Sequence, residues 1–185
     1  MAAVKAAHYP CSTAPAPLAL RAAVAALLAV LALAGCGKPE TVRSPPPPSR
    51  VWSATRPSDP AAANAVLMRA IGLVGTPYRY GGNTPDSGFD CSGLVNYVFR
   101  DMLDLRLPRT SRELAAMQGP KIATDRLAPA DLVFFGSGGD ISHVGIYVGE
   151  GRFVHAPRTG GTVRLDRLDG AYWRDHYTGA KRVLD

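Results

Sequence analysis

Three residues of this chain have the chemistry of a nucleophile and its base. Cys91 lies in the segment GFDCSGLV (Gly88–Val95), and His143 and His155 lie in two later apolar segments. A thiolate attacks carbonyl carbons, and a neighbouring imidazole takes the thiol proton and later protonates a leaving amine. A second imidazole, hydrogen-bonded to the first, fixes its tautomer and orientation. If the three side chains meet, the chain can hydrolyse an amide bond.

Other interpretations compete with this one. Cys91 could be a small core residue, half of a disulfide, or a zinc ligand together with His143 and His155. Each histidine could equally be a satisfied polar group on a half-buried strand. A zinc site lacks metal-like spacings and a fourth ligand. The spacing alone leaves the nucleophile and the core thiol open.

Cys91 is predicted to lie in the first turn of a helix. Apolar residues recur behind it at helical spacing, namely Leu94, Val95, Val98, Phe99 and Met102. Asp90 is a natural N-cap. The helix dipole and an adjacent imidazolium would lower the pKa of the thiol, and the Asp90 carboxylate would act mildly against them. The amide of Cys91 is placed to donate to an oxyanion.

Helical patterns come first in the chain and strand patterns follow. A helix is predicted over residues 61–75, and a shorter one restarts at Thr110, where Glu113 completes a capping box. Strands are predicted at 131–135, 143–149, 152–156, 161–165 and 180–184, with a short helix near 167–175. This order indicates an α+β domain, with N-terminal helices packed on an antiparallel β-sheet.

The hairpin between the two histidine strands decides whether a joint site exists. A two-residue turn at Glu150-Gly151 pairs Ile146 with His155 and separates the histidines, because side chains alternate along a strand. A three-residue loop over Gly149–Gly151 brings them to one face, and its final glycine suits the left-handed conformation such loops require. A site that contains both histidines therefore needs the three-residue loop or an equivalent β-bulge.

The N-terminal part of the chain is predicted to be a targeting segment. Residues 22–34 are uncharged and apolar and end at small residues, which is the order of a secretory signal. The residues LAGC (Leu33–Cys36) resemble the lipobox of bacterial lipoproteins, which are cut before a cysteine that is then acylated. The resemblance implies a signal peptide over residues 1–35 and a palmitate-type lipid anchor on Cys36. An ordinary secretory signal or a plain membrane anchor is the alternative.

The remaining sequence divides into a linker and one domain. Residues 36–60 are rich in proline and would form an extended spacer. The folded domain is expected over residues 61–185.

The cysteine count favours a reactive thiol. The chain has only Cys11, Cys36 and Cys91. Cys11 would leave with the signal and Cys36 would carry lipid, so Cys91 has no disulfide partner in a compartment that oxidises spare thiols.

The charge gives a weaker indication. The chain carries +6, and loss of Lys5 and Arg21 with the signal leaves +4, which suits an anionic envelope surface. The sequence contains no basic cluster with interleaved aromatic residues, so it gives no indication of a nucleic-acid partner.

The domain resembles the NlpC/P60 family of cell-wall cysteine peptidases, which are papain-like in their core. Six segments carry the resemblance in the family's order and spacing: GTPYRYGG, FDCSGLV, LPRTS, LAPADLVFF, SHVGIYVG and FVHAP. Together they span nearly all of residues 61–185. Ala130 departs from the family, which usually has glycine there, and this concerns the geometry of a turn.

The resemblance implies roles for six residues. The nucleophile falls on Cys91, the general base on His143 and the third polar group on His155. Three further positions would assist the oxyanion or bind the amino end of a stem peptide, namely Tyr78, Asp90 and Ser92. No metal ligand and no cofactor is implied.

The implied activity is hydrolysis of an amide bond in peptidoglycan, either γ-D-glutamyl to diaminopimelate or D-alanyl to diaminopimelate. We expect a monomer that acts on peptidoglycan and is held to a membrane by its lipid. Gly37 after the acylated cysteine favours the outer membrane, facing the periplasm. Two alternatives are an amidase or acyltransferase on the same fold and a catalytically silent wall-binding lipoprotein.

Overall fold

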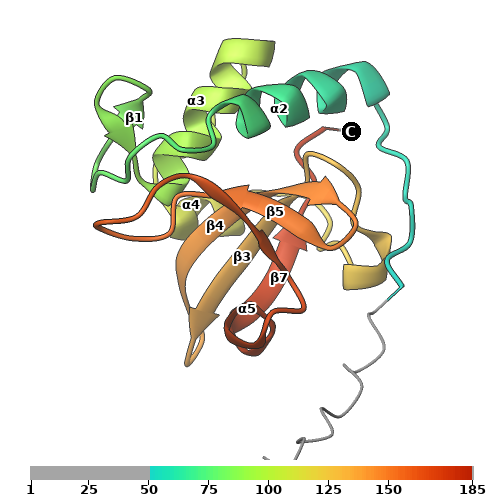
Figure 1. The fold of residues 1–185 in the computed structure, drawn as a ribbon. Coiled ribbons are helices and arrows are strands. Elements are labelled where there is room, and N and C mark those ends of the chain that lie inside the picture. Colours follow the sequence, from blue (N-terminus) through green and yellow to red (C-terminus); the bar gives the residue numbers. More distant parts are fainter. Residues whose placement is uncertain (1–50, 185) are drawn as a thin grey trace, which may run out of the picture. The chain divides into compact units, whose positions relative to one another are not determined.

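The computed structural model describes residues 51–184, which contain two long helices and a five-stranded antiparallel sheet (Figure 1). The helices are α2 (Pro60–Gly72) and α3 (Cys91–Leu103). The strands lie in the order β6-β5-β4-β3-β7. Their bounds are Leu132–Ser137 for β3, Asp140–Gly149 for β4, Arg152–His155 for β5, Arg164–Arg167 for β6 and Tyr177–Lys181 for β7. The predicted α+β fold is confirmed.

Shorter elements complete the domain. A two-stranded ribbon of β1 (Asn83–Thr84) and β2 (Gly88–Phe89) precedes α3. Two short helices, α4 (Ser111–Ala116) and α5 (Ala171–His176), and a 3₁₀ turn at Thr124–Arg126 lie further along the chain. The capping box predicted at Thr110 and Glu113 is present at the start of α4.

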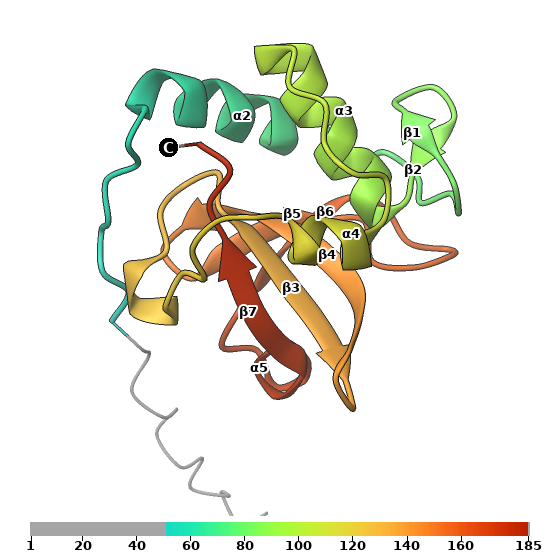
Figure 2. The same cartoon turned by 180° about the vertical axis from the view of Figure 1, so that it is seen from behind.

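The sheet separates two apolar clusters. On the face covered by α2 and α3, sheet residues such as Val144 and Ile146 pack against Leu94 and Val98 of α3. On the other face, Phe135 and Phe153 pack with Trp173 of α5. Helix α5 lies at the start of β7, as the view from behind shows (Figure 2). Because neighbouring residues of a strand point to opposite faces, β4 contributes to both clusters.

Helix α2 buries mainly small apolar residues. Its buried residues are Ala63, Val66 and Ala70, whereas Met68 is 64% exposed and Ile71 is 41% exposed. Small residues let this helix lie close to its neighbours, and its larger apolar side chains point outward. Three predicted elements lie at slightly different positions in the structure. Strand β6, strand β7 and helix α5 each begin about three residues away from the start that was predicted for them.

The β4–β5 hairpin differs from both predicted forms. The turn has two residues, Glu150 and Gly151, both with positive φ (52° and 71°), as a type I′ turn requires. The register then shifts between Tyr147 and Gly149, which leaves Val148 as an extra residue, and beyond this bulge Ile146 pairs with Val154. The equivalent bulge that the joint site needs is therefore present.

Two further observations concern the start of the described chain. Within the predicted linker, Trp52 packs against Tyr147, with ring centroids 6.4 Å apart. The signal peptide, Cys36 and residues 36–50 of the linker lie outside the described residues. Within residues 51–184, no helix is long and apolar enough to cross a bilayer.

Candidate active site

Cys91 is the first residue of α3, as predicted. The carboxylate of Asp90 caps the helix and accepts a hydrogen bond of 2.7 Å from the amide of Gly93. The thiol is half-buried against the helix-covered face of the sheet. The amide N–H of Val144 in β4 is directed at the sulfur, together with the amides of Ser92 and Cys91 itself. The sequence neighbour of His143 therefore contacts the thiol.

The pKa of Cys91 is shifted in the direction opposite to the one predicted from the helix start. Burial raises it, and the Asp90 carboxylate adds to this, while the amide of Val144 favours the thiolate and opposes them. The net effect is a pKa above that of an ordinary thiol. The resting thiol is therefore protonated, because removal of water disfavours the charged form.

The two histidines meet and are joined to an aspartate that the sequence interpretation missed. His143 Nε2 lies 2.8 Å from His155 Nδ1, and His155 Nε2 lies 3.1 Å from Oδ2 of Asp166. Asp166 also accepts hydrogen bonds from Trp173 Nε1 at 2.7 Å and from Arg164 at 2.8 Å. Burial raises the pKa of Asp166, but these donors outweigh it and leave the pKa below its usual value.

This series determines the tautomers. An ionised Asp166 only accepts hydrogen bonds, so His155 donates to it from Nε2 and its Nδ1 is the acceptor. His143 must then donate from Nε2 to His155, which leaves the Nδ1 of His143 unprotonated. That nitrogen is a free base on the strand that contacts Cys91.

Both imidazoles are neutral at ordinary pH. Burial lowers the pKa of His143 to about 3, and the positive charge that His155 would carry lowers it further, against the attraction of Asp166. Burial lowers the pKa of His155 to about 4, although Asp166 opposes this shift. Trp173 covers part of both rings: it stacks on His143 at 5.3 Å between ring centroids and meets His155 edge-on at 4.7 Å.

Sequence reasoning missed Asp166 because of a misplaced strand boundary, and it assigned no role to Trp173 in the helix predicted near 167–175. The predicted strand ended at residue 165, but β6 continues and places Asp166 opposite Phe153. Phe153 and His155 are two residues apart and share a face, so Asp166 shares it too. A correct strand boundary would have placed an acid beside His155.

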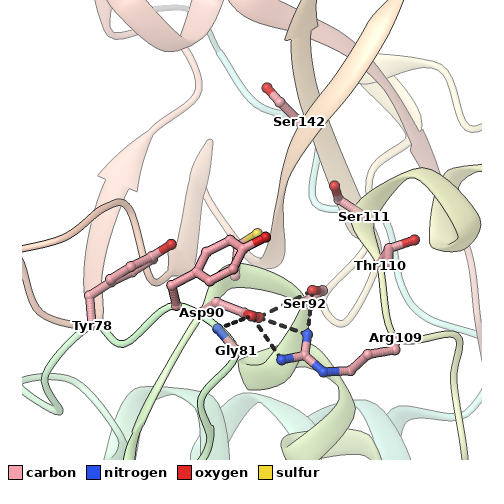
Figure 3. Close-up of a pocket in the computed structure, with 10 residues that line it drawn as sticks. Tyr78, Gly81, Asp90, Ser92, Arg109, Thr110, Ser111 and Ser142 are labelled. Atoms are coloured by element: carbon pink, nitrogen blue, oxygen red, sulfur yellow. Dashed lines mark hydrogen bonds and ion pairs between the residues drawn. The ribbon is translucent and has the colours of Figure 1, made fainter.

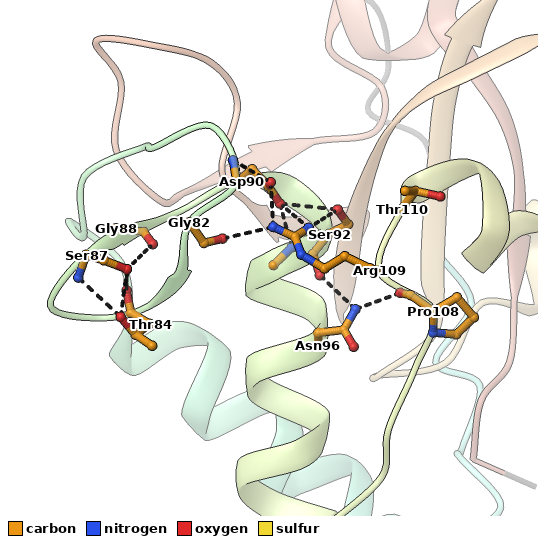
Figure 4. Close-up of polar contacts among 12 residues, drawn as sticks. Gly82, Thr84, Ser87, Gly88, Asp90, Ser92, Asn96, Pro108, Arg109 and Thr110 are labelled. Carbon is orange, nitrogen blue, oxygen red and sulfur yellow. Dashed lines mark hydrogen bonds and ion pairs between the residues drawn. The ribbon is translucent and has the colours of Figure 1, made fainter.

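A second polar cluster surrounds the start of α3. Arg109 donates to both oxygens of Asp90, at 2.9 and 2.8 Å, and to Ser92 Oγ at 2.8 Å (Figure 4). The amide of Gly81 donates to Asp90 as well, at 2.9 Å. Burial raises the pKa of Asp90, but the hydrogen bonds from Arg109 and Gly93 outweigh it and hold the pKa below its usual value. Arg109 lay in a recognised segment without an assigned role.

A cavity of about 500 Å³ opens beside Cys91 (Figure 3). Asp90, Ser92 and Arg109 line one side of the cavity, and Ser142 lies at the other side. Tyr78, which also lines the cavity, forms a bridge with Phe89 of β2. Burial raises the pKa of Tyr78, so its hydroxyl stays protonated and can donate a hydrogen bond. Cys91 and the three predicted substrate-side residues thus line one cavity. His143 and His155 lie on the neighbouring strands, and a direct Cys91–His143 hydrogen bond is not among those formed by residues 51–184.

Metal binding finds no support in this arrangement. Both ring nitrogens of His155 are engaged, by His143 and by Asp166. Among residues 51–184, no three histidine, cysteine or acidic side chains converge in a way that could hold a metal ion.

At its first turn, α3 carries a thiol beside a strand with a hydrogen-bonded imidazole, which is the arrangement of a cysteine peptidase. Residues 75–182 match the NlpC/P60 family, and the chain belongs to this family. The predicted family is therefore confirmed.

Named relatives agree with this assignment. The chain is 41% identical over 160 residues to the probable endopeptidase NlpC of Escherichia coli K12, a match that covers 85% of this chain and 96% of that protein. It is 41% identical over 126 residues to murein DD-endopeptidase MepH of the same strain, covering 66% of this chain and 46% of MepH. The chain thus spans about half the length of MepH.

A solved structure shows the same fold. The NlpC/p60 domain of the peptidoglycan hydrolase SagA superposes with a TM-score of 0.58 at 31% identity, covering 65% of this chain and 98% of that one.

Proposed function

We propose that this chain is a peptidoglycan endopeptidase that cleaves amide bonds of stem peptides or their crosslinks through a thioester on Cys91. The observation that carries the proposal is the series Asp166–His155–His143, which leaves His143 Nδ1 unprotonated beside the residue whose amide contacts the thiol. The names of the relatives support the substrate class, since MepH is a murein DD-endopeptidase and SagA a peptidoglycan hydrolase.

The acylation step moves one proton twice. The Cys91 thiol gives its proton to His143 Nδ1 while the sulfur attacks the scissile carbonyl carbon, so that an S–C bond forms. The imidazolium then passes the proton to the amide nitrogen, the C–N bond breaks, and the amine leaves. Burial disfavours both the thiolate and the imidazolium. Proton transfer therefore accompanies the attack and does not precede it.

Hydrolysis of the thioester repeats these movements with water. His143 Nδ1 takes a proton from a water molecule, whose oxygen attacks the acyl carbon. The S–C bond breaks, the carboxylic acid leaves, and the sulfur recovers its proton from the imidazolium. In both half-reactions the amide of Cys91 and the hydroxyl of Tyr78 are donors for the oxyanion.

The cluster at the start of α3 binds the acyl half of the substrate. Ser92 and Arg109 line the cavity that holds Cys91, and Asp90 fixes the guanidinium of Arg109 through two hydrogen bonds. In this proposal the ionised Asp90 and the hydroxyl of Ser92 hold the amino end of a stem peptide on the acyl side of the scissile bond.

Analysis of muropeptides by mass spectrometry tests the activity. Peptidoglycan treated with the purified full-length chain should release stem-peptide fragments, and Cys91→Ala protein should release none. Whole stem peptides freed from glycan would instead identify an amidase. Wall binding without products from either protein would identify a silent binding protein.

The envelope location is a further part of the proposal. A signal cut before Cys36, a lipid on that cysteine and a proline-rich spacer over residues 36–60 would hold a monomeric enzyme at the outer membrane, within reach of a fixed polymer. Cell fractionation with labelled palmitate tests this. Wild-type protein should carry label in the outer-membrane fraction, and the Cys36→Ala protein should lose both the label and the location.

A further inference from the structure

We propose that a cationic, aromatic cleft next to His143 binds a free carboxylate on the leaving half of the substrate, with Arg158 as its anchor. The inference rests on the proposed endopeptidase function. We call it the leaving-group cleft. Its lining includes Ser142, His143, Pro157, Arg158, Tyr172 and Trp173.

The cleft consists of two adjoining cavities. One, of about 270 Å³, is lined by Ser142 and His143, and the other, of about 330 Å³, is lined by Arg158. They adjoin because Pro157, Tyr172 and Trp173 line both. Ser142 also lines the cavity that contains Cys91. Ser142 is thus the point where the thiol side and the imidazole side of the site meet.

The chemistry assigns each side to one half of the substrate. The acyl carbon must lie at Cys91, which attacks it, whereas the amide nitrogen must lie within reach of His143, which protonates it. The chain that follows the nitrogen therefore continues on the side of His143. That side is the leaving-group cleft, and the cavity with Asp90 and Arg109 is left for the acyl half.

The charge of the cleft indicates an anionic ligand. No acidic residue lines either cavity. Arg164, which lines the same cavity as Arg158, is already bound to Asp166 by two hydrogen bonds. Arg158 differs, because among residues 51–184 its exposed guanidinium has no hydrogen bond or ion pair with another side chain. An arginine fork of this kind matches a carboxylate in geometry and charge.

The aromatic wall suits the carbon skeleton that carries the carboxylate. Tyr172 is 62% exposed and stacks on His176 at 4.2 Å between ring centroids. It also meets Trp173 edge-on at 4.9 Å. An amino acid that supplies the leaving amine and keeps a free carboxylate, as diaminopimelate does in wall crosslinks, presents both features to this cleft.

Two synthetic substrates test the inference. They share the acyl half and the scissile amide, and the leaving residue ends in a carboxylate in one and in a carboxamide in the other. Wild-type enzyme should have a kcat/KM about 10-fold higher for the carboxylate, the size expected of one charge-assisted contact. Arg158→Gln should lose that preference by slowing only the carboxylate substrate, and Arg158→Lys should retain part of it.

Controls separate this inference from the proposed function. Arg100→Gln removes an exposed cation of α3 that lines none of these cavities and should behave as wild type. Equal effects of Arg158→Gln on both substrates, or no effect, would overturn the role of Arg158 while the endopeptidase function stands. If the wild-type chain cleaves neither substrate and releases nothing from peptidoglycan, both proposals fall.

Discussion

The two polar clusters that flank Cys91 use burial in opposite ways. At the start of α3, Arg109 and backbone amides keep the Asp90 carboxylate ionised despite its burial. On the sheet, His143 and His155 are held neutral because the attraction of Asp166 does not outweigh the cost of burying their positive charges. In the proposed function, the first cluster supplies a fixed charge for binding, and the second accepts a proton and changes its charge.

Removing the thiol between the two clusters should have the largest effect. Cys91→Ala eliminates the thiol that we propose as the nucleophile, so release of muropeptides should fall at least about 10³-fold. The cavity remains, so binding to insoluble peptidoglycan in a pull-down should be unchanged. Residual digestion near the wild-type rate would show that neither cluster serves a catalytic thiol.

The buried cluster can be altered at its far end with Asp166→Asn. An amide can donate to His155 Nε2, which reverses both tautomers and places the proton of His143 on Nδ1, where the base is needed. We expect kcat to fall about 100-fold, the low end of the loss of a general base, with little change in KM, measured on a synthetic peptide. Asp175→Asn, at an exposed ion pair with Arg174, is the matched control. A loss confined to KM would exclude a positioning role for Asp166.

The neutral state of the histidines predicts a stability that depends on pH. Their folded pKa values of about 3 and 4 lie below the ordinary value of 6.5, so the unfolded chain binds more protons between these limits. This contribution to stability is complete above pH 6.5 and declines as the pH falls toward the lower folded pKa, about 3. Between pH 7 and pH 4.5 the Tm should drop by about 10 °C.

The variant His155→Asn sharpens this measurement, because it removes one of the two groups. Its Tm should fall less over the same interval, as followed by circular dichroism. An identical decline in both proteins would assign the acid sensitivity to groups outside the pair.

Disruption of the charged cluster should have the smallest effect. Arg109→Gln removes two hydrogen bonds from Asp90, but the guanidinium is partly exposed and two amides still cap the carboxylate. We expect a loss of about 1 kcal/mol in unfolding free energy at pH 7, measured with urea. The loss should shrink as the pH falls through the depressed pKa of Asp90, because the protonated carboxyl no longer attracts the guanidinium. Arg112→Gln, in an exposed pair with Asp140, should leave the urea midpoint unchanged.

Local signals allowed much of this architecture to be predicted. The cap at Asp90 and the capping box at Thr110 depend on a few adjacent residues, and both are present. Ala130 was identified as a replacement for a turn glycine, and its φ is 73°, in the left-handed region that favours glycine. These features are set by the chain within one or two turns of structure.

Features that depend on tertiary packing could not be predicted in the same way. The pKa of Cys91 is raised because β4 covers the thiol, which a helix-dipole argument from the sequence does not include. Asp166 was missed because the strand that carries it extends further than its apolar pattern indicates. The roles of Cys91, His143, His155, Tyr78, Asp90 and Ser92 stay predictions that the substitutions above address.

The extra residue at Val148 has a consequence for how such a site can vary. The bulge determines which face of the sheet each side chain of β5 points to. One residue fewer in the hairpin would turn every side chain of that strand to the opposite face. His155 would then point toward the helices, and Asp166 and His143 would lose the group that connects them. Substitutions along β5 change the site gradually, whereas a single-residue deletion in the hairpin would remove its function at once and keep nearly the same composition. The count of residues between His143 and His155 is thus as much a part of the site as the histidines themselves.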